Sequence, residues 1–232
     1  LWVVGSVLIH GALALSLGDE GPAATESFTR ALGGYDPLLA QSFAVSRKAR
    51  ASEERRALIA RARADRARGA LTLGDFLLEA NAIDAAEDSQ AFDLPAARAA
   101  YRARVRDLTL HLAQVSAREA VARTFADLGY AGLPGGRMGE ALLKKQGSCE
   151  PTSQLVAAAL HDAGRESDAA LRYYGGSTAG VTHLAAVIDH GGKEYDLMGG
   201  GLSRAGGARF PASELIEVYE RAHSAAGERL AG

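Results

Sequence analysis

The sequence contains a single cysteine, Cys149, among its 232 residues. One cysteine excludes an intramolecular disulfide and any zinc site built from cysteine ligands. The chain also lacks a strong excess of either charge, because 26 basic residues stand against 28 acidic ones and the formal net charge is −2. A chain with this balance is no polyelectrolyte, and we expect no nucleic-acid partner.

Motifs for metals and cofactors are lacking as well. No spacing of histidine and carboxylate residues suggests a metal site, so we expect none. The glycines at 199–201 lack the strand, loop and helix that a phosphate-binding loop requires, and we expect no cofactor. Hydrophobic residues make up 47% of the chain, which is enough for a folded core.

The first 18 residues, LWVVGSVLIHGALALSLG, carry no charge. This length lies at the short end for a transmembrane helix and at the long end for a signal-peptide core. We therefore expect residues 1–18 to be a membrane anchor or an export signal; a buried core helix is the alternative. Ser6 and His10 share one face of such a helix, and a histidine in an apolar span suggests an intramembrane partner.

The Ser6 and His10 pair, followed by Gly11 and Ala12, resembles the membrane anchor of TonB-type energy transducers. The resemblance covers only residues 6–13. It implies that the chain contacts the membrane through this segment, with an inner-membrane anchor and a periplasmic domain. The alternative is an ordinary anchor or the signal of an exported protein.

Residues 19–115 are predicted to form a helical region, either an antiparallel bundle or a cap on the following domain. Pro37 suits the first turn of a helix that continues to Gly69. The expected N-caps of the next three helices are Thr72, Asp93 and Ser116. The helix after Ser116 is expected to end at Gly129.

Residues 47–68 are strongly basic, with nine Lys and Arg residues against three acidic ones. One interpretation is contact with anionic lipid headgroups or a cell-wall polymer. The alternative is a solvated face of an arginine-rich helix. No aromatic residue interleaves with these charges, so binding of single-stranded nucleic acid has little support.

After Gly147 the pattern changes. One helix over residues 151–163 is followed by three runs with strand character and a last helix over about 212–226. The three runs are AALRYYGG, THLAAVIDH and KEYDLMGG. The predicted fold class is α+β, with a helical N-terminal region before a helix packed on a small antiparallel sheet.

Cys149 stands where the helix of this part begins. A nucleophilic cysteine must be a thiolate, and the N–H groups and dipole of a helix N-terminus favour that charge. The same N–H groups suit the oxyanion of a tetrahedral intermediate, and Gln146 is a candidate to assist them. The alternatives are a cysteine packed as a small apolar residue and a glutamine that merely ends the preceding helix.

His183 is the best candidate for the imidazole that such a thiolate needs, with Asp196 on the next strand to orient it. A two-residue turn between these strands would pair Val187 with Asp196 and leave His183 about 13 Å away. A four-residue loop would instead pair Asp196 with Ala185, which makes His183 its diagonal neighbour. The triad hypothesis therefore predicts the longer loop or a bulge.

Three other histidines have less chemical interest. His161 and His190 are expected to be exposed, on a helix surface and in the hairpin loop. His111 lies among apolar residues of a helix and is expected to be a packed histidine of the core or its boundary.

The order of Gly147-Ser148-Cys149 before a helix, His183 at the start of a strand, and Tyr195-Asp196-Leu197 in the next resembles the transglutaminase-like superfamily, a permuted papain-like fold. The resemblance covers residues 116–200, and we expect a transglutaminase-like domain over 116–232. It implies that Cys149 is the nucleophile, His183 the general base and acid, and Asp196 the orienting carboxylate.

The resemblance also implies an activity. The chain would be a cysteine-dependent amide hydrolase or acyl transferase of the bacterial cell envelope, acting on a protein or peptide, with hydrolysis preferred over cross-linking. Two alternatives stay open. One is a catalytically inactive transglutaminase-like binding module, and the other is a TonB-like membrane-anchored component.

Overall fold

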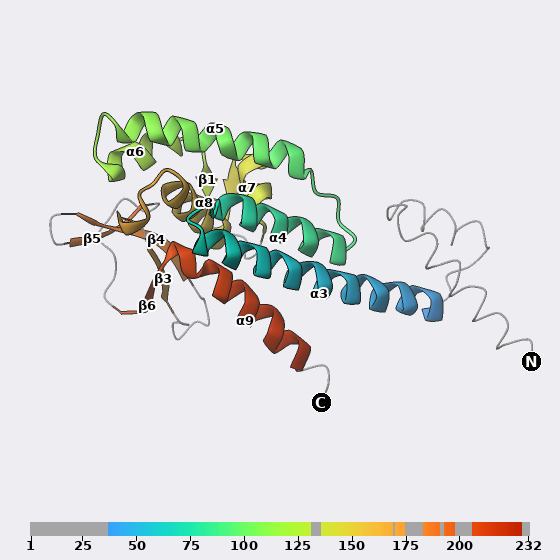
Figure 1. Cartoon of the computed structure of the whole chain (residues 1–232). Coiled ribbons are helices and arrows are strands. Elements are labelled where there is room, and N and C mark those ends of the chain that lie inside the picture. Colours follow the sequence, from blue (N-terminus) through green and yellow to red (C-terminus); the bar gives the residue numbers. More distant parts are fainter. Residues whose placement is uncertain are drawn as a thin grey trace, which may run out of the picture. The chain divides into compact units, whose positions relative to one another are not determined.

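The computed structural model describes residues 37–130, 136–168, 170–174, 183–190, 193–197 and 206–228 (Figure 1). The chain divides into two compact units: residues up to Glu54 with Ile83–Ala91, and Arg55–Ala82 with Phe92 onward. The segment 1–18, with Ser6 and His10, lies outside the described residues. Within the described ranges, no helix combines the length and the apolar character needed to cross a membrane.

Helices dominate the first part of the described chain, as the sequence predicts. They are α3 (Pro37–Ala67), α4 (Leu73–Glu87), α5 (Leu94–Leu112), α6 (Ala117–Thr124) and α7 (Met138–Lys144). Two predicted N-caps are confirmed by their hydrogen bonds. Asp93 accepts from the N–H of Ala96, and Ser116 accepts from the N–H of Glu119.

The predicted end of the helix after Ser116 is wrong. α6 stops at Thr124, and Gly129 lies in β1 (Gly129–Tyr130), which pairs in parallel with β2 (Gln146–Gly147). The N–H of Gly129 donates to the carbonyl of Lys145 over 2.9 Å. In a longer α6 the N–H of Gly129 would have bonded to a carbonyl within the helix. Here it bonds to Lys145, 16 residues later in the sequence.

The C-terminal part confirms the predicted α+β class. α8 (Cys149–Asp162) precedes a four-stranded antiparallel sheet of order β5-β4-β3-β6. The strands are β3 (Ala170–Tyr174), β4 (His183–His190), β5 (Lys193–Asp196) and β6 (Ala208–Pro211). Short 3₁₀ turns, η1 (Glu166–Asp168) and η2 (Ala212–Glu214), flank the sheet in the sequence. The last helix is α9 (Leu215–Glu228). The sequence left room for further strands but did not locate β6, which lies outside the three runs with strand character.

The two faces of the sheet have different neighbours, because side chains alternate along a strand. α8 packs against β4, and Arg118 of α6 stacks on the ring of Tyr195 in β5. Tyr195 pairs with Ile188, so Leu184, Ala186 and Ile188 lie on the helix-covered face.

The opposite face carries the alternate residues of the same strands. Ala170, Ala185 and Val187 form a small separate apolar cluster there that includes no residue of α8. Charged side chains surround it, with Glu194 accepting from Arg172 and Arg209. Among the described residues of this face, charged side chains thus border the small apolar cluster.

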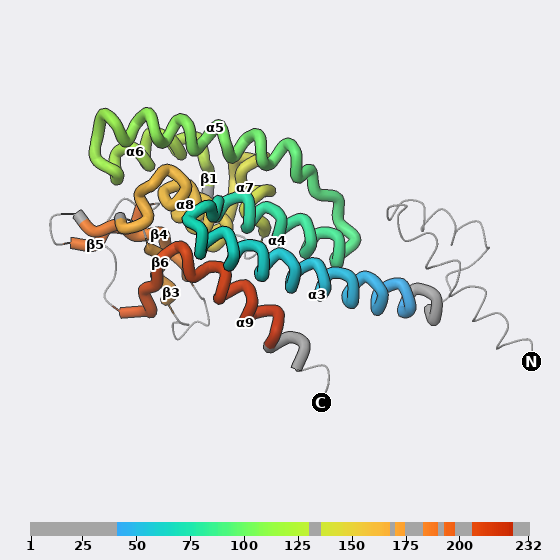
Figure 2. Tube along the Cα trace, viewed as in Figure 1, coloured from blue at the N-terminus to red at the C-terminus, as the bar shows by residue number. Residues whose placement is uncertain are grey.

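The basic segment of α3 pairs with carboxylates of other helices. Arg63 and Arg66 donate to Glu220 and Glu217 of α9, a helix some 150 residues later in the sequence. Figure 2 shows α3 and α9 side by side. Arg61 reaches Glu79 of α4 in the same way. Several of these arginines thus form ion pairs between helices, which neither interpretation of the sequence foresaw. Contact of the basic segment with lipid or cell-wall polymer stays a prediction.

A carboxylate from α8 caps the start of α4. Asp162 Oδ1 and Oδ2 accept from the N–H groups of Leu73 and Gly74 over 2.8 and 2.9 Å. Tyr101 of α5 donates its hydroxyl to Asp162 over 2.7 Å, and His161 Nδ1 lies 2.8 Å from Oδ1. We call these five residues the Asp162 junction. The prediction that His161 is exposed is wrong, since its side chain is only 11% exposed.

Gly74 makes the junction sterically possible. A Cβ at this position would lie 2.0 Å from Cζ of Tyr101, whose ring is buried. The absent side chain therefore lets the tyrosine pass over the first turn of α4 and reach Asp162.

Gly74→Ala should lower the free energy of unfolding by about 2 to 4 kcal/mol, because the ring of Tyr101 must move and its bond to Asp162 breaks. Urea denaturation measures the change. Gly129→Ala is the matched control, since its Cβ would make only ordinary contacts at 3.7 Å, and we expect a change within about 0.5 kcal/mol. Equal losses in both variants would contradict this account of Gly74.

Candidate functional site

Cys149 is the first residue of α8, as expected, and is half-buried. Ser148 is the N-cap in extended conformation, and its side chain makes no capping hydrogen bond. The amide groups of the first turn thus have no side-chain cap from Ser148. The position is the one that favours a thiolate on physical grounds.

A close contact fixes the loop before Cys149. A Cβ at Gly147 would lie 2.7 Å from Cβ of Ala141 and 2.9 Å from Cγ2 of Thr152. Glycine therefore lets the loop pack between α7 and α8 at the point where α8 begins. Thr152 also holds the cap, because its hydroxyl donates to the carbonyl of Ser148 over 2.6 Å.

Charges tie this segment to α5. Asp127 accepts from Arg104 over 2.6 Å and pairs with Lys145 over 3.1 Å. The hydrogen bond from Arg104 is the main cause that lowers the pKa of Asp127 to about 2, with Lys145 adding to it. The carboxylate is thus ionised at any ordinary pH and holds the chain just before the cysteine.

His183 lies at the same end of the helix–sheet pair as Cys149. The hydroxyl of Ser153, one turn after Cys149, donates to the carbonyl of Leu184 over 3.0 Å. Leu184 follows His183 directly, so the start of β4 lies beside the first turn of α8. The structure thereby brings the backbones of the predicted nucleophile and imidazole to one end of the sheet.

The His183 side chain belongs to the other face of the sheet. It alternates with Leu184, shares its face with Ala185 and Val187, and is exposed. Its ring stacks on Tyr174, the residue opposite on β3, with ring centroids 5.7 Å apart. No hydrogen bond joins Cys149 and His183, both of which the structure describes. The imidazole is thus held by an aromatic ring on the face away from α8.

Asp196 is the last residue of β5 and lies beside the middle of β4. It pairs with Val187, and His190 pairs with Lys193, so two residues connect the strands and the predicted four-residue loop is wrong. The N–H of Leu197 extends this register by donating to the carbonyl of Ala186. His183 is four residues from Val187, or about 13 Å along the strand.

The same register shows what an orienting carboxylate would need. To face Ala185, and so lie diagonal to His183, it would have to stand at position 198, where the sequence has methionine. The structure thus brings the backbones of two of the three predicted residues to one end of the sheet and leaves Asp196 four residue positions further along β4.

The remaining predicted residues are placed as follows. Gln146 is exposed in β2, where it pairs with Gly129. His111 is partly buried and its Nδ1 lies 2.9 Å from the hydroxyl of Thr124, which confirms a packed boundary histidine. Among the described residues, no three His, Cys, Asp or Glu side chains gather closely enough to hold a metal ion.

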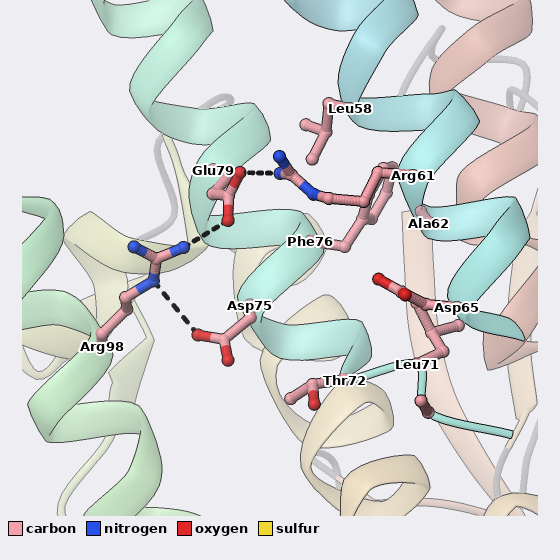
Figure 3. A pocket seen from close by; sticks show the side chains of 11 residues that line it. Leu58, Arg61, Ala62, Asp65, Leu71, Thr72, Asp75, Phe76, Glu79 and Arg98 are labelled. Carbon is pink, nitrogen blue, oxygen red and sulfur yellow. Dashed lines mark hydrogen bonds and ion pairs between the residues drawn. The ribbon is translucent and has the colours of Figure 1, made fainter. Parts of the chain in front are cut away.

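A cavity of about 200 Å³ lies between α3 and α4, with Arg98 of α5 at its edge (Figure 3). Glu79 accepts from both Arg61 and Arg98, and Arg98 also donates to Asp75 over 3.2 Å. These charges neutralise one another across the mouth, while Leu58 and Phe76 line the wall. Cys149, His183 and Asp196 do not line this cavity.

Sequence reasoning missed the Asp162 junction, although a signal for it exists. The negative end of a helix dipole disfavours an acidic residue in the last turn. Asp162 nevertheless ends an apolar helix, which indicates a partner elsewhere in the fold. The identity of that partner, the N-terminus of α4, depends on packing and not on local sequence.

Ser153→Ala should lower the free energy of unfolding by about 1 to 2 kcal/mol, because the carbonyl of Leu184 then lacks its buried donor. Thermal or urea denaturation measures the loss. Thr109→Ala is the control, since that exposed hydroxyl bonds only to the carbonyl of Val105 in its own helix and should change stability by less than about 0.5 kcal/mol. A neutral Ser153→Ala would show that the bond does not hold β4 against α8.

No family model matches the chain, and neither do the curated proteins or the solved structures compared with it. The function is therefore inferred from the geometry of the described residues and from the pattern of the sequence.

Proposed function

We propose that the C-terminal part of the chain, from Ser116 onward, is a transglutaminase-like module of the bacterial cell envelope that binds a protein or peptide without hydrolysing it. The transglutaminase-like assignment is supported by the order of elements. A helix that begins with the cysteine packs on antiparallel strands, and the histidine opens the second strand while the aspartate lies on the third.

Two observations on the placement of His183 carry the proposal that the module binds and does not hydrolyse. The β4–β5 register separates Asp196 from His183 by four residue positions, and the imidazole stacks on Tyr174 away from α8. A general base must come within hydrogen-bond reach of the thiol, and an orienting acceptor within reach of the base. Neither condition is met by this arrangement.

A cysteine hydrolase is the second candidate, and one observation favours it. The Ser153–Leu184 bond keeps the His183 end of β4 beside the first turn of α8. In such an enzyme the Cys149 sulfur would attack a carbonyl carbon and His183 would protonate the leaving amine. Water would then attack the thioester, releasing the acid and restoring the thiol.

Thiol chemistry separates the two candidates, because Cys149 is the only cysteine. For a binding module we expect the native chain to react with iodoacetamide, at each pH between 6 and 9, no faster than a cysteine-containing model peptide measured beside it. His183→Ala should leave that profile unchanged, as should the control His111→Gln. Mass spectrometry with an acyl-trapping probe should find no adduct on Cys149.

The hydrolase predicts the opposite results. A reactive thiolate below pH 7, lost in His183→Ala and kept in His111→Gln, together with an acyl adduct at Cys149, would overturn the binding module.

Binding itself needs a separate measurement. A peptide library passed over immobilised wild-type chain and over Cys149→Ser should leave the same peptides bound and intact on both. Cleaved peptides on the wild type alone would support the hydrolase, and retention of no peptide by either chain would contradict the proposal.

A further inference from the structure

The Asp162 junction concentrates four hydrogen-bond donors on one carboxylate that is only 5% exposed. The donors come from three helices: two backbone N–H groups of α4, the Tyr101 hydroxyl of α5 and the His161 ring of α8 itself. A buried carboxylate is stable only when such partners compensate for its lost hydration. The junction is thus the place where α4, α5 and α8 are joined through a single charge.

His161 is the donor in the junction whose charge changes near neutral pH. The groups facing its ring are Asp162 at Nδ1 and Glu166 of η1, whose carboxylate lies 3.8 Å from Nε2. On the far side of Asp162 stand Tyr101 and the N-terminus of α4. Burial and the charge of Asp162 raise the pKa of Tyr101 well above its ordinary value, so this hydroxyl stays a donor throughout the neutral range.

We propose that the Asp162 junction is a pH-sensitive clamp in which a protonated His161 holds the carboxylate in place against the start of α4, and which loosens when the ring loses its proton. The inference does not depend on the function of Cys149. The clamp has a physical basis in the pair itself, because a protonated ring adds the attraction between two opposite charges at a site largely shielded from water, and a neutral ring does not.

The direction of the pH effect follows from the histidine. The hydrogen bond to Asp162 raises the pKa of His161 above its ordinary value of 6.5, burial opposes this, and the charges of Asp162 and Glu166 add to the increase. A raised pKa in the folded state means that the stabilisation is fully present below about 6.5 and is lost as the pH rises through the folded-state pKa. The clamp therefore tightens in acid and loosens in mild alkali.

The loosening should be local. After deprotonation, Asp162 still accepts from Leu73, Gly74 and Tyr101, so α4 stays attached but opens more often. The amides of Leu73 and Gly74, which the carboxylate binds directly, report this opening in hydrogen exchange.

The test is hydrogen exchange followed by NMR on the whole chain between pH 5.5 and 8.5, with each rate divided by the intrinsic rate at that pH. In the wild type we expect the protection of the Leu73 and Gly74 amides to fall about threefold to tenfold across this range. In His161→Gln, which keeps a neutral side chain of similar reach, protection should be low and independent of pH. His111→Gln, which alters a histidine bonded to a hydroxyl, should keep the wild-type dependence.

Two results would overturn the clamp. One is a wild-type protection of Leu73 and Gly74 that stays flat while the His161 ring is seen to titrate in the NMR spectra. The other is the same pH dependence in His161→Gln as in the wild type. If His161→Gln does not fold, the wild-type measurement alone decides between these outcomes, because the ring titration and amide protection come from one sample.

Discussion

A buried carboxylate at the end of an apolar helix needs hydrogen-bond donors to replace its lost water. Asp162 obtains them from α4 and α5, and the packing of these helices on α8 depends on those bonds. The side chain is 5% exposed, and the described donors that reach it come from α4, α5 and its own helix. Breaking such a buried charge network typically costs several kcal/mol. Position 74 must then be glycine as long as Tyr101 is present, since the tyrosine ring occupies the space that a Cβ at position 74 would need. The first turn of α4 is thus built around a residue almost 90 positions later.

Charge also joins α3 to its neighbours, although in a more exposed setting. Arg63 and Arg66 pair with α9, and Arg61 pairs with Glu79 of α4. Each exposed ion pair contributes little, commonly below about 1 kcal/mol, so these contacts select the alignment of the helices more than they stabilise it. The difference from the Asp162 junction is burial: the same kinds of charge have a strong effect only where water is excluded.

The region around Cys149 has some requirements of a thiol enzyme and lacks others. The helix start, the close-packed glycine before it and the bond between Ser153 and Leu184 place the cysteine and the start of β4 at one end of the sheet. Strand register decides the rest. Pairing Asp196 with Val187 moves the carboxylate along the sheet, and alternation turns His183 to the other face. A shift of two residues in the hairpin register separates the observed arrangement from the one that a triad needs, because a triad tolerates displacements of only about an ångström.

The sequence by itself determined the α+β class and the three strands β3 to β5. It also determined the two N-caps at Asp93 and Ser116 and the start of α8 near Cys149. These features depend on capping residues, apolar periodicity and glycines, which act within a few residues of the chain. Tertiary structure alone decided the hairpin register, the short β1–β2 pair that replaces a longer helix, the strand β6 and the partner of Asp162. Each of these features joins groups that are far apart in the sequence, and local sequence patterns do not distinguish one such pairing from another. The burial of His161 shows the same limit, since an imidazole at a helix end is exposed or enclosed according to what packs on it.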